Sequence, residues 1–316
     1  MQEQPVIRQS DKQSGSGGIM GQSVGVIGLG AMGMGIAQNL LRGEFAVLAY
    51  DLSQAAMARA GDSGIAIAAS PVEVMHAADT VVLSLPLARH VEETIEAGFA
   101  AGVFDNRQGM VIIDTSTSET AVSRRLAARL AEAGHGFLDA PVSGGPQGAA
   151  NGALSMMIGG DAEWVAKAQP VLDSMAAKVI HVGDSGAGNI AKLVNNMLVA
   201  CHMLTTAEAL RLSEAAGLPA KDALRVINSA TGRSALSEVH FPNWVLTRSF
   251  DSGFSAGLMR KDVRLALELA SDAGCTMPVS ELVAELWSEA RSGLEDTDDF
   301  MLMGDPAAHA KERTDD

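Results

Sequence analysis

Short apolar or β-branched runs alternate with alanine-rich stretches of helical pattern from Ser23 to about His181. The runs are SVGVIGLG, FAVLAYD, TVVLSLP, MVIIDTS, GFLDAPVS and SMMIGG. Alternation of this kind predicts βαβ units, and hence a mostly parallel sheet that helices cover on both faces. This part of the chain is therefore predicted to form an α/β domain.

The strand pattern ends after Gly183, and the remaining chain has the pattern of helices. The helical segments cover 189–216, 220–229 and 259–273, and the breaker sequences GLP and CTMP interrupt them. A continuous helix over the first segment would be roughly 40 Å long at about 1.5 Å per residue. We expect this helix to run along the junction between the α/β domain and an all-helical domain, where small-ligand clefts tend to form.

These patterns divide the chain into four segments. We expect residues 1–22 to form a flexible arm, 23–184 the α/β domain, 185–303 the helical domain and 304–316 an acidic disordered tail. From Glu295 onward eight acidic residues outnumber two basic ones, which gives a net charge of −6. We interpret this acidic run as a solvated tail without a chemical role.

The overall charge argues against a polyanionic partner. The chain carries 23 Lys and Arg against 38 Asp and Glu, a net charge of −15, so nucleic acid and anionic membrane surfaces would repel it. Its apolar runs are shorter than a membrane span, and residues 1–22 lack the features of a signal peptide. Two cysteines in no paired spacing indicate neither a disulfide framework nor a thiolate metal site, and fit a cytoplasmic protein.

The segment VGVIGLGAMGMG places glycines in the GxGxxG spacing, directly after an apolar strand and before a helical run. Gly28 suits a tight turn, Gly30 lets the backbone approach a pyrophosphate, and Gly33 lets helix and strand pack closely. The helix N-terminus would then face the phosphates. The predicted dinucleotide-binding residues of this Rossmann-type loop are Gly28, Leu29, Gly30, Ala31, Met32 and Gly33.

An acidic residue follows at the distance that dinucleotide binding requires. Asp51 ends the strand FAVLAYD, where a carboxylate receives the adenosine ribose hydroxyls and repels a 2′-phosphate. NAD is therefore favoured over NADP, although Arg59 could still reach a phosphate. The alternative is that Asp51 only caps the next helix.

Two further loops follow apolar strands, at the strand ends where open α/β sheets bind ligands. LSLP contributes Leu85 and Pro86, and DTSTS contributes Thr117, which we expect beside the nicotinamide half of the cofactor. As an alternative, these residues are ordinary turn and cap residues. A third loop, DAPVSGGPQGAANG, could bind a carboxylate through the hydroxyl and backbone N–H groups of residues 143–145, unless it is a plain connector.

The predicted long helix begins with GAGNIAKLVNN. Lys192, Asn195 and Asn196 share one face of it. Beside that face lies an apolar stripe made of Leu193, Met197, Cys201 and Leu204. A single lysine on a helix is most often solvated surface. A lysine and two amides in the first turns of so apolar a helix favour a functional role instead.

Together these motifs resemble the β-hydroxyacid dehydrogenases, the family of 3-hydroxyisobutyrate dehydrogenase and tartronate semialdehyde reductase, over about residues 24–302. The resemblance rests on the glycine loop with its GIAQNL continuation, DAPVSGG, GAGNIAKLVNN and GFSAGLMRKDVRLAL. It implies NAD, or NADP, as cofactor and a small carboxylate as substrate. It further implies an N-terminal NAD-binding Rossmann domain, a helical domain for substrate binding and oligomerisation, and a homodimer or homotetramer.

The resemblance also assigns roles by position. Lys192 is similar to the catalytic lysine of the family. The substrate-binding positions that it implies are Ser143, Gly144, Gly145, Asn196, Phe254 and Asp262. The further cofactor-binding positions are Leu85, Pro86, His90, Thr117 and Lys261. Two departures put loop details in question: His90 replaces an asparagine common in relatives, and residues 118–121 lack a proline found there.

These roles predict a mechanism. Lys192 would move the hydroxyl proton, although a lysine with an ordinary pKa of about 10.4 is a poor base at neutral pH and requires burial or neighbouring positive charge. The expected reaction interconverts a short 3-hydroxy carboxylic acid and its semialdehyde or ketone. Substrate choice would depend on pocket shape, through Thr231, Arg233, Ser234, Phe254 and the loop 118–121.

Several alternatives remain open at this stage. Within the family, a tartronate semialdehyde (2-hydroxy-3-oxopropionate) reductase or a threonate-type dehydrogenase fits the same motifs. From other classes, an imine reductase or a noncatalytic dinucleotide-binding protein shares the architecture. A hydrolase is disfavoured because the chain has no GxSxG, and a metalloenzyme because its seven histidines show no HExxH spacing.

Overall fold

The computed structural model describes residues 22–105 and 107–305, which divide into two compact units with a boundary between Lys192 and Leu193. The boundary falls inside the long helix, whereas the sequence pattern places the division at 184/185, just before it. The expected flexible arm lies outside the described residues except for Gln22, as do residues 306–316 of the expected tail.

The first unit is built on one sheet, which has nine strands among its described residues. Its spatial order is β3-β2-β1-β4-β5-β6-β8-β7, with β9 paired to β8. The ladders are parallel except where β8 meets β6 and β7. The strands are β1 (Ser23–Ile27), β2 (Ala46–Tyr50), β3 (Ala66–Ile67), β4 (Thr80–Leu83), β5 (Val111–Asp114), β6 (Gly136–Asp139), β7 (Val142–Ser143), β8 (Leu154–Gly159) and β9 (Ala176–Gly183).

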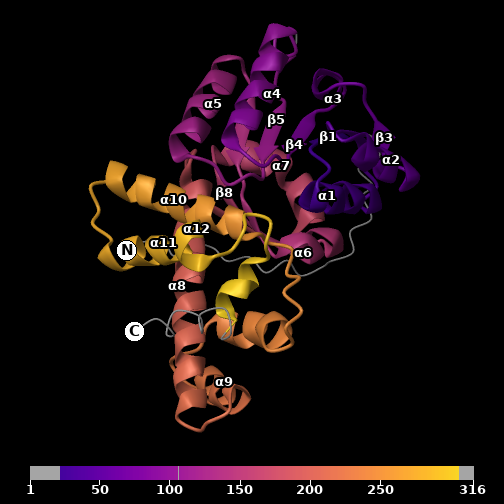
Figure 1. The fold of residues 1–316 in the computed structure, drawn as a ribbon. Helices are drawn as coiled ribbons and strands as arrows, with labels where there is room; N and C mark the ends of the chain where they lie inside the picture. Colours follow the sequence, from indigo (N-terminus) through magenta and orange to yellow (C-terminus); the bar gives the residue numbers. More distant parts are fainter. Residues whose placement is uncertain (1–21, 106, 306–316) are drawn as a thin grey trace. The chain divides into compact units, whose positions relative to one another are not determined.

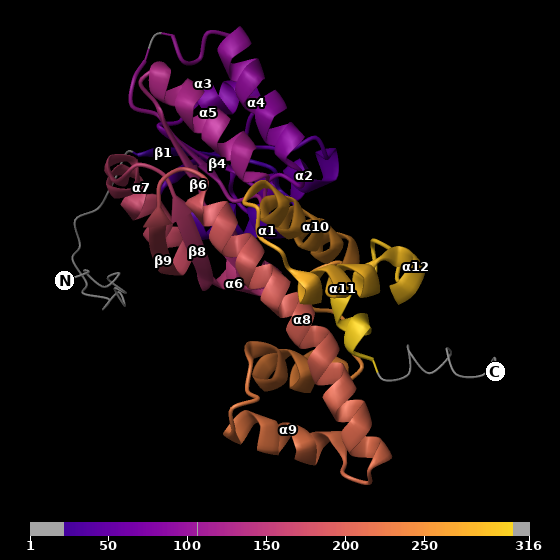
Figure 2. The same ribbon diagram turned by 90° about the vertical axis from the view of Figure 1, so that its left-hand side faces the viewer.

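Helices cover both faces of this sheet. In Figures 1 and 2, α3, α4 and α5 lie on one side of the strands, and α1, α6 and α7 lie on the other. The helices of this unit are α1 (Ala31–Arg42), α2 (Gln54–Asp62), α3 (Pro71–Ala77), α4 (Ala88–Ala100), α5 (Thr120–Glu132), α6 (Gly145–Asn151) and α7 (Ala162–Met175).

Alternate residues of the central strands build two separate cores. Val111 and Ile113 of β5 belong to the core that includes Leu40 of α1, whereas Ile112 between them belongs to the core that includes Ile95 of α4. Because successive side chains of a strand point to opposite faces, Val111, Ile112 and Ile113 must all be apolar when both faces of the sheet are buried. The predicted α/β fold is confirmed, and β3 and β9 are strands that the pattern missed.

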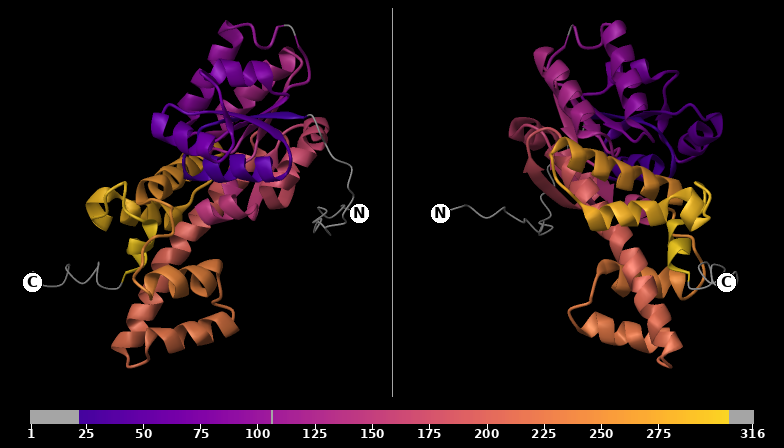
Figure 3. Two further views of the ribbon diagram at one scale, coloured as in Figure 1. Left: turned by 90° about the vertical axis from the view of Figure 1, so that its right-hand side faces the viewer. Right: turned by 60° about the vertical axis from the view of Figure 1, so that its left-hand side comes forward.

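The second unit is helical and has its own core, which surrounds the fully buried Trp287 and Phe241. The indole Nε1 of Trp287 donates to the carbonyl oxygen of Ala200 over 3.3 Å. In Figures 2 and 3, α9 lies beside the C-terminal half of α8. The elements are α8 (Ala187–Ala215), which begins in the first unit, α9 (Ala220–Ser229), the π-helix η1 (Leu236–Val245), α10 (Ala256–Asp272), α11 (Pro278–Trp287), α12 (Glu289–Ser292) and the 3₁₀-helix η2 (Phe300–Gly304). Within the described part of the chain, every helix is too short or too polar to cross a membrane.

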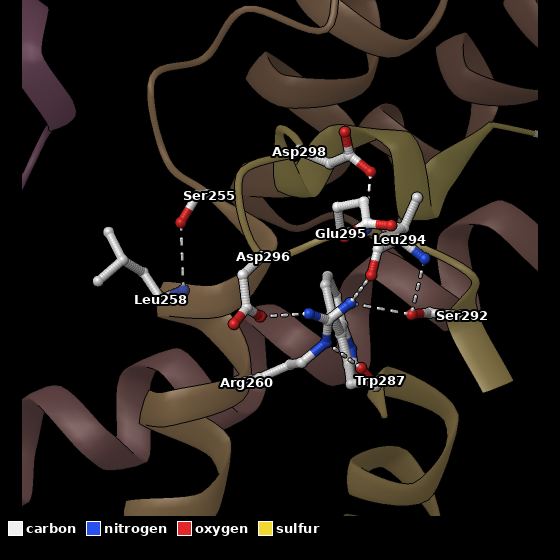
Figure 4. Close-up of polar contacts among 9 residues, drawn as sticks. All are labelled: Ser255, Leu258, Arg260, Trp287, Ser292, Leu294, Glu295, Asp296 and Asp298. Carbon is white, nitrogen blue, oxygen red and sulfur yellow. Dashed lines mark hydrogen bonds and ion pairs between the residues drawn. The ribbon is translucent and has the colours of Figure 1, made fainter. Parts of the chain in front are cut away.

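The acidic segment from Glu295 is folded as far as Asp305, so the prediction of a solvated tail is wrong for these residues. Arg260 of α10 donates to Asp296 Oδ1 over 2.5 Å, to the carbonyl oxygen of Trp287 over 2.8 Å and to the carbonyl oxygen of Leu294 (Figure 4). One guanidinium therefore neutralises an acidic residue and ties the end of α11 to the segment that follows α12.

The other acidic residues of this segment also have partners. Asp299 accepts hydrogen bonds from Ser252 Oγ, Gly253 N and Met301 N at 2.8–3.0 Å. Asp305, placed in the disordered tail by its charge, is buried and pairs with Arg248 at 3.0 Å. Ser252, Gly253 and Arg248 are distant in sequence from the acids that they bind, so a charge count along the chain could not reveal these contacts.

Candidate functional site

The predicted cofactor loops leave the sheet at one edge. Ile27 of β1 is in register with Tyr50 of β2 and with Leu83 of β4, and Leu83 is in register with Asp114 of β5. Asp114 is in turn in register with Asp139 of β6. Because these strands are parallel, the segments that follow them all emerge beside one another, as the strand-end argument predicts.

The glycine loop has the geometry that its three glycines imply. Gly28 has a φ of +96°, and an added Cβ would lie 2.3 Å from the carbonyl oxygen of Ser84. A Cβ on Gly33 would lie 1.9 Å from the carbonyl oxygen of Gly28, so any side chain there would separate helix and strand. Gly30 is exposed, and a Cβ there would meet open space, which leaves room for a diphosphate.

The first turn of α1 is available to a ligand. Gly30 is the N-cap of α1 and has no side chain with which to cap it, so the N–H groups at the start of the helix can bind an anion. Leu29 is buried beneath the loop, Met32 is half-buried, and Ala31 is exposed at the helix start. These residues fit a dinucleotide diphosphate by shape and by hydrogen-bond chemistry.

Asp51 directly follows β2, and two backbone N–H groups hold its carboxylate. Leu29 N donates to Oδ2 over 2.6 Å, and Ser53 N donates to Oδ1 over 2.7 Å. The helix-cap alternative is wrong, because the N-cap of α2 is Ser53, whose hydroxyl accepts from Ala56 N. Asp51 is thus anchored to the glycine loop. Arg59 lies exposed on α2.

The loops after β4 and β5 are joined to each other. Leu85 N donates to Ser116 Oγ over 3.3 Å, so the LSLP loop contacts the loop that carries Thr117. Pro86 is exposed and Thr117 half-buried, and His90 lies half-buried in the first turn of α4. The two loops predicted from separate motifs therefore form one surface.

The SGG segment turns sharply after β7. Gly144 has a φ of +128° and Gly145 a φ of +64°, conformations that favour glycine, and Gly144 is the N-cap of α6. Ser143 pairs with Ser155 of β8 in an antiparallel ladder, which fixes where this turn begins. Consecutive glycines of this kind present backbone N–H groups, so the predicted carboxylate site has a suitable backbone.

The first turn of α8 is anchored by side chains that the sequence analysis did not assign. Asp139 at the end of β6 accepts hydrogen bonds from Gly186 N and Asn189 N, at 2.7 and 2.9 Å. Burial raises the pKa of Asp139, while these backbone N–H groups act in the opposite direction. Asn189 is completely buried and also binds Ser118 N. Both residues stand within quoted motifs, but their pairing depends on the fold.

Lys192 follows Asn189 by three residues on α8, and its side chain is only 7% exposed. This burial excludes the alternative of a solvated surface lysine. Leu193 and Met197, which belong to the predicted apolar stripe, are buried in the core of the second unit. The hydrophobic stripe of this helix is therefore confirmed at these positions.

In the second unit, Asn196, Lys261 and Asp262 form one cluster. Asn196 Nδ2 donates to Asp262 Oδ2 over 2.5 Å, and Lys261 Nζ lies 3.4 Å from Asp262 Oδ1. Asn196 is 4% and Asp262 2% exposed. Asn196 Oδ1 accepts from Asn195 Nδ2, so the carboxamide is oriented from both ends.

The remaining predicted residues also lie in the second unit. Phe254 packs edge-on against Phe300, with ring centroids 5.3 Å apart, and belongs to the rim of the helical core. Thr231 and Arg233 line a surface hollow with neighbouring residues 228–230. Ser234 instead forms hydrogen bonds with Ser237 at the start of η1.

Within the described residues, no three His, Cys, Asp or Glu side chains lie close enough together to hold a metal ion.

Both units match known protein families. Residues 23–183 match the NAD binding domain of 6-phosphogluconate dehydrogenase, and residues 186–305 match the family described as NAD-binding of NADP-dependent 3-hydroxyisobutyrate dehydrogenase. Together the two matches cover almost all of the described chain.

Individual relatives match over most of their length. A 2-(hydroxymethyl)glutarate dehydrogenase from Eubacterium barkeri is 36% identical over 269 residues, 85% of this chain and 89% of the relative. An NAD-dependent L-serine dehydrogenase from Pseudomonas aeruginosa is 36% identical over 274 residues, 84% and 91% of the two chains. A structure of Mycobacterium tuberculosis 3-hydroxyisobutyrate dehydrogenase with L-serine has a TM-score of 0.83 and 33% identity, and the match covers 90% of this chain and 98% of that one.

Proposed function

Since this chain belongs to the β-hydroxyacid dehydrogenase family, we propose that it interconverts a short 3-hydroxy carboxylic acid and its semialdehyde or ketone, in the manner of 3-hydroxyisobutyrate dehydrogenase. It is an NAD(P)-dependent oxidoreductase that acts on a CH–OH group. The observation that carries the proposal is the buried Lys192, one helical turn before the buried Asn196 on α8.

The first unit would hold the dinucleotide. The N-terminus of α1 and Gly30 would receive the diphosphate, and Asp51 the adenosine ribose hydroxyls. When bound, the nicotinamide supplies or accepts the hydride. Leu85, Pro86, His90 and Thr117 would border that ring, and the family resemblance assigns Lys261 to cofactor binding as well.

Asp51 supports a preference for NAD over NADP. Its carboxylate is held in place by Leu29 N and Ser53 N, so it would stay close to a 2′-phosphate and repel it. In Asp51→Ser this repulsion is removed, and kcat/KM with NADP should rise relative to that with NAD. An unchanged cofactor ratio would contradict the assignment of Asp51 to the ribose.

Lys192 would move the proton of the substrate hydroxyl. It acts as a base in oxidation and as an acid in reduction, so both protonation states must be reachable. The side chain is buried, so bulk water is largely excluded from the group that moves this proton. The long helix supplies a rigid support for it.

The other predicted residues would orient the substrate. Asn196 would hold the substrate in register with Lys192, and Ser143, Gly144 and Gly145 would bind the carboxylate. Phe254 and Asp262 are further substrate-binding positions that the family resemblance implies. Two anionic ligands would thus be bound by local groups of a chain whose net charge is −15.

The test is Lys192→Ala. Dinucleotide affinity, measured by fluorescence titration, should remain, whereas kcat should fall at least about a hundredfold. Lys221→Ala on α9 serves as the control, because that lysine is exposed. Near-parental turnover of Lys192→Ala would refute this role.

The relatives favour a substrate with its hydroxyl β to a carboxylate, a feature that 2-(hydroxymethyl)glutarate, L-serine and 3-hydroxyisobutyrate share. A panel of 3-hydroxyisobutyrate, L-serine, 2-(hydroxymethyl)glutarate, glycerate and threonate, each with NAD and NADP, tests the proposal by the absorbance of the reduced cofactor. Activity on cyclic imines without activity on these acids would favour an imine reductase, and binding without turnover a noncatalytic protein.

We also propose that the chain forms a homodimer or homotetramer. Val194, Leu198 and Leu212 of α8 are 54%, 53% and 72% exposed, which leaves apolar surface on a long helix. Light scattering coupled to size exclusion gives the mass directly. A monomer at micromolar concentration would contradict this proposal.

A further inference from the structure

One buried side chain joins the Thr117 loop to the start of α8. Asn189 is completely buried, its Oδ1 accepts from Ser118 N over 2.9 Å, and its Nδ2 donates to Ser123 Oγ over 2.9 Å. Ser118 directly follows Thr117, and Ser123 lies in α5. The carboxamide oxygen thus binds a backbone donor and the carboxamide nitrogen binds a hydroxyl acceptor.

The same helical turn is fixed to the sheet by a carboxylate. Asp139 Oδ1 accepts from Gly186 N and Oδ2 from Asn189 N, so Asp139 caps α8 through two N–H groups. Asn189 therefore contacts β6 through its backbone and the Thr117 loop through its side chain. The end of β6, the Thr117 loop and the start of α8 are distant in sequence, and all three meet at Asn189.

Close backbone packing leaves the turn little freedom to move. A Cβ on Gly188 would lie 2.3 Å from the carbonyl oxygen of Asp139 and 2.5 Å from that of Met157. A Cβ on Gly159 would lie 2.7 Å from Gly188 N. The first turn of α8 is therefore packed directly on the ends of β6 and β8.

We propose that Asn189, held by Asp139, is a positioning residue that keeps Lys192 in register with the loop that carries Thr117. This inference rests on the proposed function, in which Lys192 moves the proton and Thr117 borders the nicotinamide. Lys192 follows Asn189 by three residues on one helix, so a shift of this turn moves both. A misplacement of about 1 Å can cost about a hundredfold in rate even when the altered residue lies away from the chemistry.

Three variants remove the connection in steps. Ser123→Ala removes the partner of Nδ2, Asn189→Asp keeps an acceptor for Ser118 N, and Asn189→Leu removes both hydrogen bonds. We expect kcat to fall in this order, by about 10- to 100-fold for Asn189→Leu, while the Kd for NAD stays close to the parental value. The primary deuterium isotope effect on kcat should rise in parallel, because hydride transfer becomes slower than product release.

The matched control is Asn39→Leu. Asn39 is also a buried asparagine of the first unit, and its side chain bonds to the carbonyl oxygen of Ala149 and to Arg42. Its substitution should lower the Tm without a change in the isotope effect. Parental kcat and isotope effect in Asn189→Leu, or the same isotope effect in Asn39→Leu, would overturn the proposal.

A second measurement does not depend on turnover. Amide hydrogen exchange of the parental protein and Asn189→Leu should show faster exchange both at Ser118 and at residues 190–193 in the variant, because the Asn189 side chain links the two segments. Faster exchange at Ser118 alone would overturn the proposal.

If Lys192→Ala retains its activity, the proposed function is wrong, whatever the effect of the Asn189 variants. If Lys192→Ala is inactive while Asn189→Leu behaves as the parent, only the positioning role is wrong.

Discussion

The carboxamide Nδ2 of Asn196 donates to Asp262 Oδ2 over 2.5 Å, and both side chains are almost completely buried. The carboxylate also lies 3.4 Å from Lys261 Nζ, so it faces one cation and one amide donor. A buried carboxylate needs such partners, because an unpaired charge in this environment is costly. Asp262 thus fixes the orientation of the Asn196 carboxamide, whose Oδ1 accepts from Asn195 Nδ2.

Asp262→Asn should disturb substrate use more than folding. The neutral amide can rotate its oxygen or its NH₂ group toward Asn196, so the Asn196 orientation is no longer unique. We expect kcat/KM for the hydroxy acid to fall by about 10- to 100-fold, which corresponds to one charge-assisted hydrogen bond of about 1.5–3 kcal/mol. Steady-state kinetics give this ratio. Asp272→Asn, exposed at the end of the same helix, is the control, and an equal effect of both variants would argue against this role.

Two substitutions in the glycine loop should separate folding from binding. Gly33→Ala places a Cβ 1.9 Å from the carbonyl oxygen of Gly28 and should destabilise the protein by about 1–3 kcal/mol. Gly30→Ala adds a Cβ in open space and should leave the Tm of the cofactor-free protein unchanged, while the Kd for NAD rises at least about tenfold. Thermal unfolding with and without NAD measures both effects. Unaltered affinity in Gly30→Ala would place the diphosphate elsewhere.

The stability of the first unit should decrease at acid pH through His135. This side chain is completely buried, Met110 N donates to its Nδ1 at 3.1 Å, and its Nε2 lies 3.2 Å from the carbonyl oxygen of Phe104. Burial lowers the pKa of His135 below the ordinary 6.5, so the unfolded chain takes up a proton more readily than the folded one. The free energy of unfolding should therefore fall as the pH drops below 6.5, by at most about 1.4 kcal/mol per pH unit for this group.

His135→Gln checks the sign of this effect. Glutamine keeps a donor and an acceptor but does not titrate, so its urea unfolding should depend less on pH between 7.5 and 5.5. Burial also lowers the pKa of His240 in the second unit, so part of the dependence will remain. A pH dependence equal to the parental one would show that His135 contributes nothing to it.

The folded part of the acidic segment should matter for stability. Asp299→Ala leaves Ser252 Oγ, Gly253 N and Met301 N without their acceptor, and we expect a loss of about 1–3 kcal/mol in the free energy of unfolding. Asp251→Ala is the matched control, because Asp251 is exposed. Chemical denaturation compares the two. Similar stability in both variants would mean that the hydrogen bonds of Asp299 are replaced by water at no cost.

Local patterns were sufficient for the α/β unit and for its cofactor loop. Most residues of β1, β4 and β5 are apolar because both faces of the sheet are buried. The glycine spacing follows from contacts between residues near in sequence, such as Gly28 and Gly33. Helix α9 covers 220–229, as the pattern predicted. The strand β9 was missed because most of its residues are exposed and its hydrophobic pattern is weak.

The sequence by itself determined the fold class, the glycine loop, Asp51 and the helix that carries Lys192, since each depends on periodicity or on spacing within one βα unit. Only the tertiary structure decided which distant groups meet. Asn189 with Ser118, Asn196 with Asp262 and Arg260 with Asp296 are pairs separated by 71, 66 and 36 residues. Such pairs form because buried polar groups must find partners wherever the packed backbone places them, and no local pattern encodes that position.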